Sequence, residues 1–97
     1  MTRYRVAFSD EAIKDLASSY EWGVENWGED AAWYWYTDLK DSVQKLLASF
    51  PESQPIAPDN EEFDIEVRQM LVGRYRILFT VANKVVTIFQ IRGPYTD

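Results

Sequence analysis

The sequence has 97 residues, of which 46% are hydrophobic and 27% are charged. These values are typical of a soluble globular chain and exclude intrinsic disorder, so we expect residues 1–97 to form one domain. No apolar run approaches the ~18 residues of a membrane-spanning helix, and the N-terminus lacks the apolar stretch of a signal peptide. We therefore expect a cytoplasmic protein without a membrane partner.

The chain contains neither cysteine nor histidine. Disulfides, thiolate metal sites, His-based zinc sites and Ser-His-Asp or Cys-His catalysis are therefore excluded. Asp59, Glu61, Glu62 and Asp64 form an acidic segment without the spacing of a calcium loop, and no Gly-rich phosphate loop is present. We interpret these acids as solvated charges and expect no cofactor and no metal site.

Charge is distributed unevenly along the chain. The formal net charge is −6, which argues against tight nucleic-acid binding by the protein as a whole. Residues 1–8 carry +2 and residues 66–97 carry +3, whereas residues 9–65 combine three lysines with fourteen acids, giving −11. If the two ends share a sheet and the middle is helical, one side of the molecule is basic and the other is acidic.

The N-terminal half predicts one strand and two helices. Residues 3–8 alternate between apolar and other side chains, which is typical of a strand. Ser9 is a suitable N-cap for a helix that ends at Gly28, and a second helix runs from Glu29 until Pro51 stops it. The expected core faces of the two helices comprise Ala12, Ile13, Leu16, Ala17, Tyr20, Val24 and Trp27, then Ala32, Trp35, Tyr36, Leu39, Val43, Leu46, Leu47 and Phe50. Because only Gly28 separates the helices, they must fold back as a hairpin.

The C-terminal half predicts a loop and three strands. Residues 51–62 are rich in proline and turn formers. Alternation resumes at Phe63, Ile65 and Val67 in a strand that extends toward Gly73, and further strands cover residues 74–81 and 85–91 around a tight turn at Asn83. The order β-α-α-β-β-β predicts an α+β domain, with the helical hairpin packed on one face of a mainly antiparallel four-stranded sheet.

Short segments spread over most of the chain form a recognisable pattern. They are Tyr4-Arg5-Val6-Ala7-Phe8-Ser9, Gly28 with Ala31-Ala32, Leu46 with Pro51, Val67-Arg68, Gly73-Arg74-Tyr75-Arg76-Ile77-Leu78-Phe79 and Val86-Thr87-Ile88-Phe89-Gln90-Ile91-Arg92. In this order and spacing they resemble the RelE/ParE superfamily of toxins from type II toxin–antitoxin modules. The match favours the ParE-like, or plasmid-stabilisation, branch, because Asp64 and Glu66 stand where ribosome-dependent RelE nucleases carry lysines, and the basic tail that often follows is missing after Arg92.

This resemblance implies a toxin that is neutralised by a cognate antitoxin wrapped along the helical hairpin and the sheet. In ParE-like relatives the target is DNA gyrase, which is poisoned by binding. One alternative is a ribosome-dependent mRNA endoribonuclease, in which Arg76 takes the place of a catalytic arginine and acts with Arg68, Arg92 or Tyr95. A second alternative is a non-toxic protein-binding relative, suggested by the acidic net charge.

Two sets of residues are candidates for binding a target or an antitoxin. Arg74 and Arg76 share the strand face opposite the apolar one, so these arginines and Arg68 should crowd an open sheet face and bind an acidic partner or a phosphate backbone. The alternative for them is ion pairing with Asp64, Glu66 and the acidic segment.

Aromatic residues are dense between positions 22 and 36. Helical spacing directs Trp27, Trp35 and Tyr36 into the core. It leaves a second set off the core face, which predicts an antitoxin-docking surface or a homodimer contact. That set comprises Trp22, Trp33 and Tyr34.

Overall fold

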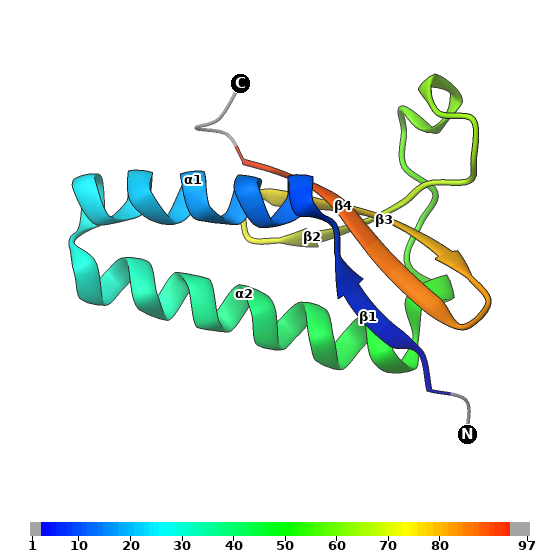
Figure 1. Cartoon of the computed structure of the whole chain (residues 1–97), viewed down its shortest axis with the longest axis horizontal. Coiled ribbons are helices and arrows are strands. Elements are labelled where there is room, and N and C mark those ends of the chain that lie inside the picture. Colours follow the sequence, from blue (N-terminus) through cyan, green and yellow to red (C-terminus); the bar gives the residue numbers. More distant parts are fainter. Residues whose placement is uncertain (1–2, 94–97) are drawn as a thin grey trace.

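The computed structural model describes residues 3–93 and confirms the α+β order (Figure 1). Its elements are β1 (Arg5–Phe8), α1 (Asp10–Trp27), α2 (Glu29–Ser49), the 3-10 turns η1 (Pro51–Ser53) and η2 (Asn60–Glu62), β2 (Arg68–Val72), β3 (Tyr75–Ala82) and β4 (Val85–Arg92). Both predicted helices have the expected limits. No helix within residues 3–93 is long and apolar enough to cross a membrane.

The four strands form one mixed sheet in the order β1-β4-β3-β2. The pairs β2–β3 and β3–β4 are antiparallel, whereas β1 runs parallel to β4 because the helical hairpin carries the chain back before β2 begins. Asn83 and Lys84 both have positive φ, at 51° and 63°, which is the backbone of a two-residue hairpin turn. The turn predicted at Asn83 is thus confirmed.

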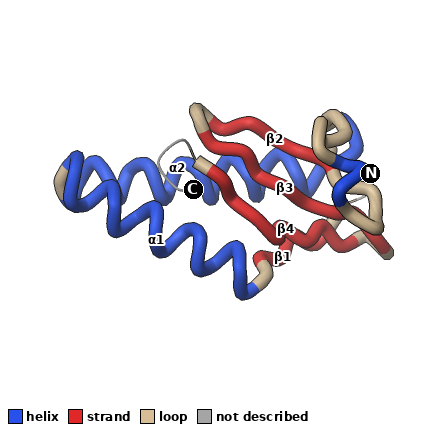
Figure 2. Tube along the Cα trace, turned by 90° about the horizontal axis from the view of Figure 1, so that it is seen from above, coloured by secondary structure: helices blue, strands red, loops and turns tan. Residues whose placement is uncertain are grey.

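The two helices lie side by side across one face of the sheet (Figure 2). Gly28, with φ of 94°, makes the sharp reversal that a side chain would strain. The shared core contains Leu16 of α1, Leu39 and Val43 of α2, and Ile77 and Phe79 of β3, all at most 4% exposed. The predicted packing of the hairpin on one sheet face is confirmed.

The helical hairpin is longer than the sheet, and its tip extends beyond the strands (Figures 1 and 2). Trp27, which the sequence placed in the core, lies at this tip and is 39% exposed. Ile13, Leu46 and Phe50 were also assigned to core faces and are 53%, 40% and 60% exposed. These assignments are wrong because helical spacing gives the direction of a side chain but not the extent of the surface that covers it.

The segment between α2 and β2 covers the sheet face that is turned away from the helices. Ala57 and Val67 are buried against Leu78, and Phe63 packs edge-on against Phe89 with ring centroids 5.5 Å apart. Residues 54–67, which we term the covering loop, therefore close over a face that the sequence predicted to be open.

The strand predicted to start at Phe63 is wrong in its first half. β2 begins only at Arg68, and the N–H of Val67 donates instead to Oδ1 of Asn60 at 2.6 Å. Phe63 and Val67 point onto the sheet while Ile65 is 61% exposed. The alternation of buried and exposed side chains thus comes from a loop that packs on the sheet and not from a strand that pairs within it.

The start of α1 yields a stability prediction. The N–H of Ala12 donates to Ser9 Oγ at 3.1 Å, and that hydroxyl donates to the Phe89 carbonyl of β4 at 3.4 Å. Ser9→Ala should lower the free energy of unfolding by about 1 kcal/mol, the usual value of an N-cap, as measured by urea unfolding. Ser18→Ala, an exposed change within α1, is the control. An equal loss in both variants would contradict the capping role.

Candidate functional site

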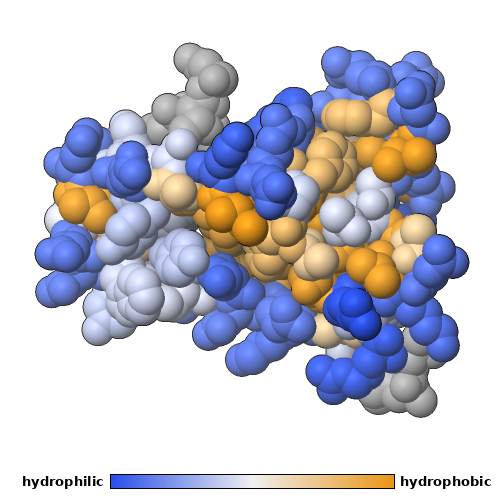
Figure 3. Space-filling model, in the orientation of Figure 1, coloured by the Kyte–Doolittle hydropathy of each residue, from blue (hydrophilic) through white to orange (hydrophobic). Residues whose placement is uncertain are grey.

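The helical hairpin presents an aromatic and apolar surface. Trp33 is 54% and Tyr34 72% exposed, as the sequence predicted. A groove of about 540 Å³ runs between α1 and α2 beside β1, with Tyr20, Tyr36 and Lys40 among its lining residues. Figure 3 shows hydrophobic residues in the middle of this face and over the strands on its right, with hydrophilic residues along the rim.

Trp22 belongs to a different environment from the one predicted. It is half-buried, and its ring meets Trp27 edge-on with centroids 5.3 Å apart. Trp27 in turn meets Trp35, which packs against Tyr75 of β3. These rings support the tip of the hairpin, so Trp22 contributes less free surface than Trp33 or Tyr34.

Arg76 of β3 and Arg92 of β4 are direct cross-strand partners, and Asp59 of the covering loop lies against both. Arg76 Nη2 donates to Asp59 Oδ1 at 2.8 Å, and Arg92 Nη1 lies 3.6 Å from Asp59 Oδ2. Arg76 Nε also donates to Gln69 Oε1 of β2 at 2.9 Å. We term these four residues the Asp59 cluster.

The Asp59 cluster balances two like charges. Guanidinium groups directly opposite each other on a sheet repel, and the carboxylate of Asp59 neutralises one of them. The hydrogen bond from Arg76 holds the pKa of Asp59 below its ordinary value of 3.8; burial opposes this shift, and the positive charges of Arg76 and Arg92 reinforce it. Asp59 is therefore ionised at neutral pH and fastens the covering loop to the sheet.

This arrangement corrects two expectations. Asp59 was interpreted as a solvated charge, but its side chain is only 19% exposed. Arg76 was predicted to stand on an open face, but it is engaged on both edges of its guanidinium group by residues of the same chain. Arg92 is bound more loosely, at 47% exposure.

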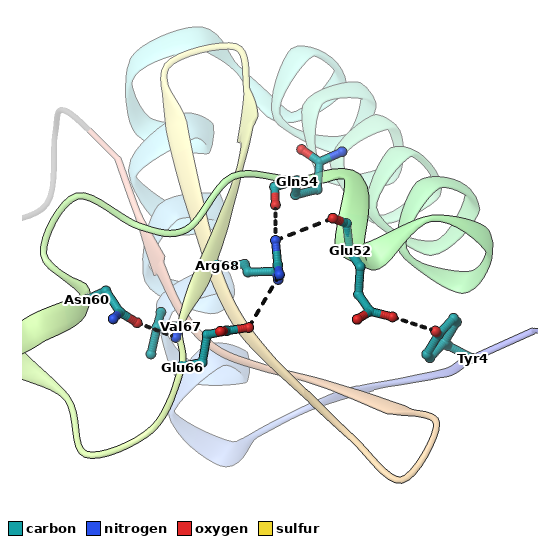
Figure 4. Close-up of polar contacts among 7 residues, drawn as sticks. All are labelled: Tyr4, Glu52, Gln54, Asn60, Glu66, Val67 and Arg68. Carbon is teal, nitrogen blue, oxygen red and sulfur yellow. Dashed lines mark hydrogen bonds and ion pairs between the residues drawn. The ribbon is translucent and has the colours of Figure 1, made fainter.

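Arg68 lies on the other side of the sheet from Arg76. Its cross-strand partner is Phe79, which faces the helices. Arg68 Nη1 donates to the carbonyls of Gln54 (2.6 Å) and Glu52 (3.3 Å), and Nη2 pairs with Glu66 at 3.3 Å (Figure 4). Arg68 thus anchors both ends of the covering loop and does not join the other arginines on one face.

Arg74 remains the most available of the candidate arginines. It is exposed in the turn between β2 and β3 and forms no ion pair within residues 3–93. It lines a hollow of about 310 Å³ together with Trp27, Trp35 and Asp38 at the tip of the hairpin. This combination of an exposed cation and the exposed ring of Trp27 was not predicted, because it depends on where the hairpin overhangs the sheet.

The arginines limit the chemistry of the site. A guanidinium group cannot accept a proton at neutral pH, so it can only stabilise developing negative charge. Tyr95, the other catalytic candidate, lies outside the described residues. Within residues 3–93, no group of three or more potential ligand side chains is placed to hold a metal ion.

The Asp59 cluster predicts a pH-dependent stability. Asp59→Asn should lower the free energy of unfolding by about 1–3 kcal/mol near neutral pH, because two opposed arginines lose their counter-charge. The folded pKa of Asp59 is depressed, so this stabilisation is complete above about pH 4 and disappears as pH falls through the folded value. Urea unfolding near pH 7 and near pH 3 should therefore show a difference that shrinks with acid.

The control for this prediction is Asp64→Asn. Asp64 belongs to the same loop but is exposed and forms no ion pair within residues 3–93. Its substitution should change stability little at either pH. If the two variants lose the same stability at neutral pH, the proposed role of Asp59 is wrong.

Comparisons with solved structures agree on the fold. The solved chromosomal ParDE TA system from P. aeruginosa is similar with a TM-score of 0.78 and 22% identity, over 94% of this chain and 96% of that chain. The RelBE2 toxin-antitoxin complex from Mycobacterium tuberculosis is similar with a TM-score of 0.70 and 15% identity, over 99% and 97%.

Comparison of the sequence identifies the family. No curated protein matches the chain in sequence. The model of the family described as "ParE toxin of type II toxin-antitoxin system, parDE" matches residues 6–93, which cover all the strands and helices except Arg5, the first residue of β1. The resemblance to the RelE/ParE superfamily is thereby confirmed, and the chain belongs to the ParE toxin family of type II toxin–antitoxin systems.

Proposed function

We propose that this protein is a toxin that acts by binding and poisoning a macromolecular target, with DNA gyrase as the first candidate, and that a cognate antitoxin neutralises it. The observation that carries the proposal is membership of the ParE toxin family over residues 6–93. Action by binding is supported by a sequence without histidine or cysteine.

The Asp59 cluster further supports binding over catalysis. A nuclease that used Arg76 and Arg92 would direct their guanidinium groups at a phosphate. Here the carboxylate of Asp59 accepts one hydrogen bond from Arg76 at 2.8 Å and lies 3.6 Å from Arg92. An RNA phosphate would have to displace Asp59 and loosen the covering loop before it met both arginines.

A cognate antitoxin is the proposed partner. Structures of toxin–antitoxin systems are similar to this fold. The exposed rings of Trp33 and Tyr34 beside the groove between α1 and α2 give such a partner large side chains to bury. A homodimer contact through the same rings is the alternative use of this surface.

One observation favours the alternative function as an endoribonuclease. Arg92 is 47% exposed and only loosely paired, so the cluster keeps a net positive charge that could meet a phosphate. Inducing the chain without its partner separates the alternatives. We expect growth arrest with accumulation of cleaved gyrase–DNA complexes. Cleavage of mRNA on translating ribosomes would instead establish the nuclease, and normal growth would indicate a non-toxic relative.

Arg74 allows a sharper test of target binding. Arg74→Ala removes an exposed cation that makes no ion pair within residues 3–93, so the fold should be retained. If Arg74 contacts the target, affinity should fall about tenfold, as for an interface arginine, and survival after induction should rise. Lys45→Ala, an exposed change on α2, is the control. Full toxicity of a folded Arg74→Ala variant would remove Arg74 from the binding surface.

A further inference from the structure

The hollow of about 310 Å³ at the tip of the helical hairpin, which we term the tip hollow, has aromatic walls. Its volume is at the small end of the range for small-molecule sites. Trp27 is 39% exposed there, Trp35 is half-buried and Tyr75 is buried. The ring of Trp35 lies 4.9 Å from that of Tyr75 and 6.3 Å from that of Trp27, with the planes inclined by 45° and 66°. Rings inclined in this way form a corner into which a further planar ring can pack.

Two opposite charges lie beside these rings. Asp38 follows Trp35 by three residues on α2, a spacing that puts both side chains on the same side of the helix. Arg74 belongs to the two-residue turn between β2 and β3, in which Gly73 has a φ of 59°. Asp38 and Arg74 are exposed, and within residues 3–93 neither forms an ion pair with the other or with any further residue. The tip hollow therefore presents an anion and a cation that do not neutralise each other.

We propose that the tip hollow binds a free aromatic amino acid. The ring of the ligand packs against Trp27 and Trp35, its carboxylate pairs with the guanidinium group of Arg74, and its ammonium group pairs with the carboxylate of Asp38. A molecule of this class carries a ring and both charges close together, which matches a small hollow with aromatic walls and two opposite charges. This inference goes beyond the proposed function and does not depend on it.

Other classes of ligand fit the tip hollow less well. An aliphatic amino acid meets both charges but gains little from aromatic walls. A nucleotide that placed a phosphate on Arg74 would bring negative charge toward Asp38, which lines the same hollow. An aromatic side chain of a partner protein uses the rings but carries neither charge, because its backbone groups are part of peptide bonds.

The test titrates isotope-labelled protein with L-tryptophan and three analogues near neutral pH. Indole-3-propionate lacks the ammonium group, tryptamine lacks the carboxylate, and N-acetyl-L-tryptophanamide lacks both charges. Binding is followed by NMR through the indole N–H resonances of Trp27 and Trp35. Tryptophan should bind with a Kd of about 1 mM or lower, as expected for a ligand of its size. Each singly charged analogue should bind about fivefold more weakly, the value of one exposed ion pair, and the neutral amide should bind most weakly.

Charge-removing variants assign each end of the ligand. Asp38→Asn should abolish the preference for tryptophan over indole-3-propionate and keep the preference over tryptamine. Arg74→Gln should do the opposite, because it removes the partner of the carboxylate. Asp41→Asn on α2 and Arg5→Gln on β1 remove the same charges from exposed positions outside the described lining of the tip hollow. These matched controls should keep both preferences.

Three outcomes would overturn this inference. The first is equal affinity for tryptophan and the neutral amide, which would assign the tip hollow to an aromatic side chain of another protein. The second is binding of leucine as tight as that of tryptophan, which would show that the rings do not contribute. The third is the absence of saturable shifts at tryptophan concentrations about tenfold above the expected Kd. None of these measurements involves toxicity, so their failure leaves the proposed toxin action untouched, and normal growth after induction would not count against the tip hollow.

Discussion

The carboxylate of Asp59 between Arg76 and Arg92 is the interaction on which the far side of the molecule depends. The two arginines are opposed on adjacent strands, and without a counter-charge they would repel each other and leave the middle of the covering loop without its ion pair to the sheet. With Asp59 in place, the covering loop buries Ala57 and Val67 on Leu78. Within residues 3–93, two long helices shield one face of the sheet and the covering loop shields the other.

The roles of the sheet arginines and of the helical hairpin differ, and this difference bears directly on function. The sheet arginines Arg68 and Arg76 hold the covering loop, so the cations most suggestive of phosphate chemistry serve the fold. The proposed surface for partners is elsewhere. Trp33 and Tyr34 are exposed on the helical hairpin, and Arg74 is exposed in the turn between β2 and β3. A toxin that works by binding needs such a surface more than it needs a catalytic centre.

The sequence predicted what local chemistry determines. Ser9 as an N-cap, Gly28 as the reversal and Asn83 as the hairpin turn each depend on residues within a few positions, and all three are confirmed. It failed where distant segments decide the outcome. The alternation of apolar side chains at residues 63–67 marks which of them are buried. A loop that packs on a sheet shows the same alternation as a strand that pairs within it.

Two further errors have the same origin. Trp27 is exposed because the helical hairpin is longer than the sheet. The pattern of apolar residues within one helix does not show how far the sheet beneath it extends. Asp59 meets Arg76 and Arg92 from 17 and 33 positions away, so an acidic run that is usually solvated contains one member with a specific partner. Sequence spacing alone did not distinguish Asp59 from Glu61 or Glu62.

A double-mutant cycle on Asp59 and Arg76 tests the central claim most directly. The free energy of unfolding would be measured for the wild type, Asp59→Asn, Arg76→Gln and the double variant. If the carboxylate and the guanidinium group hold the covering loop together, the coupling energy should be about 1 kcal/mol or more in favour of the wild-type pair. A coupling energy near zero would contradict the account, because the ion pair would then contribute nothing to holding the loop on the sheet.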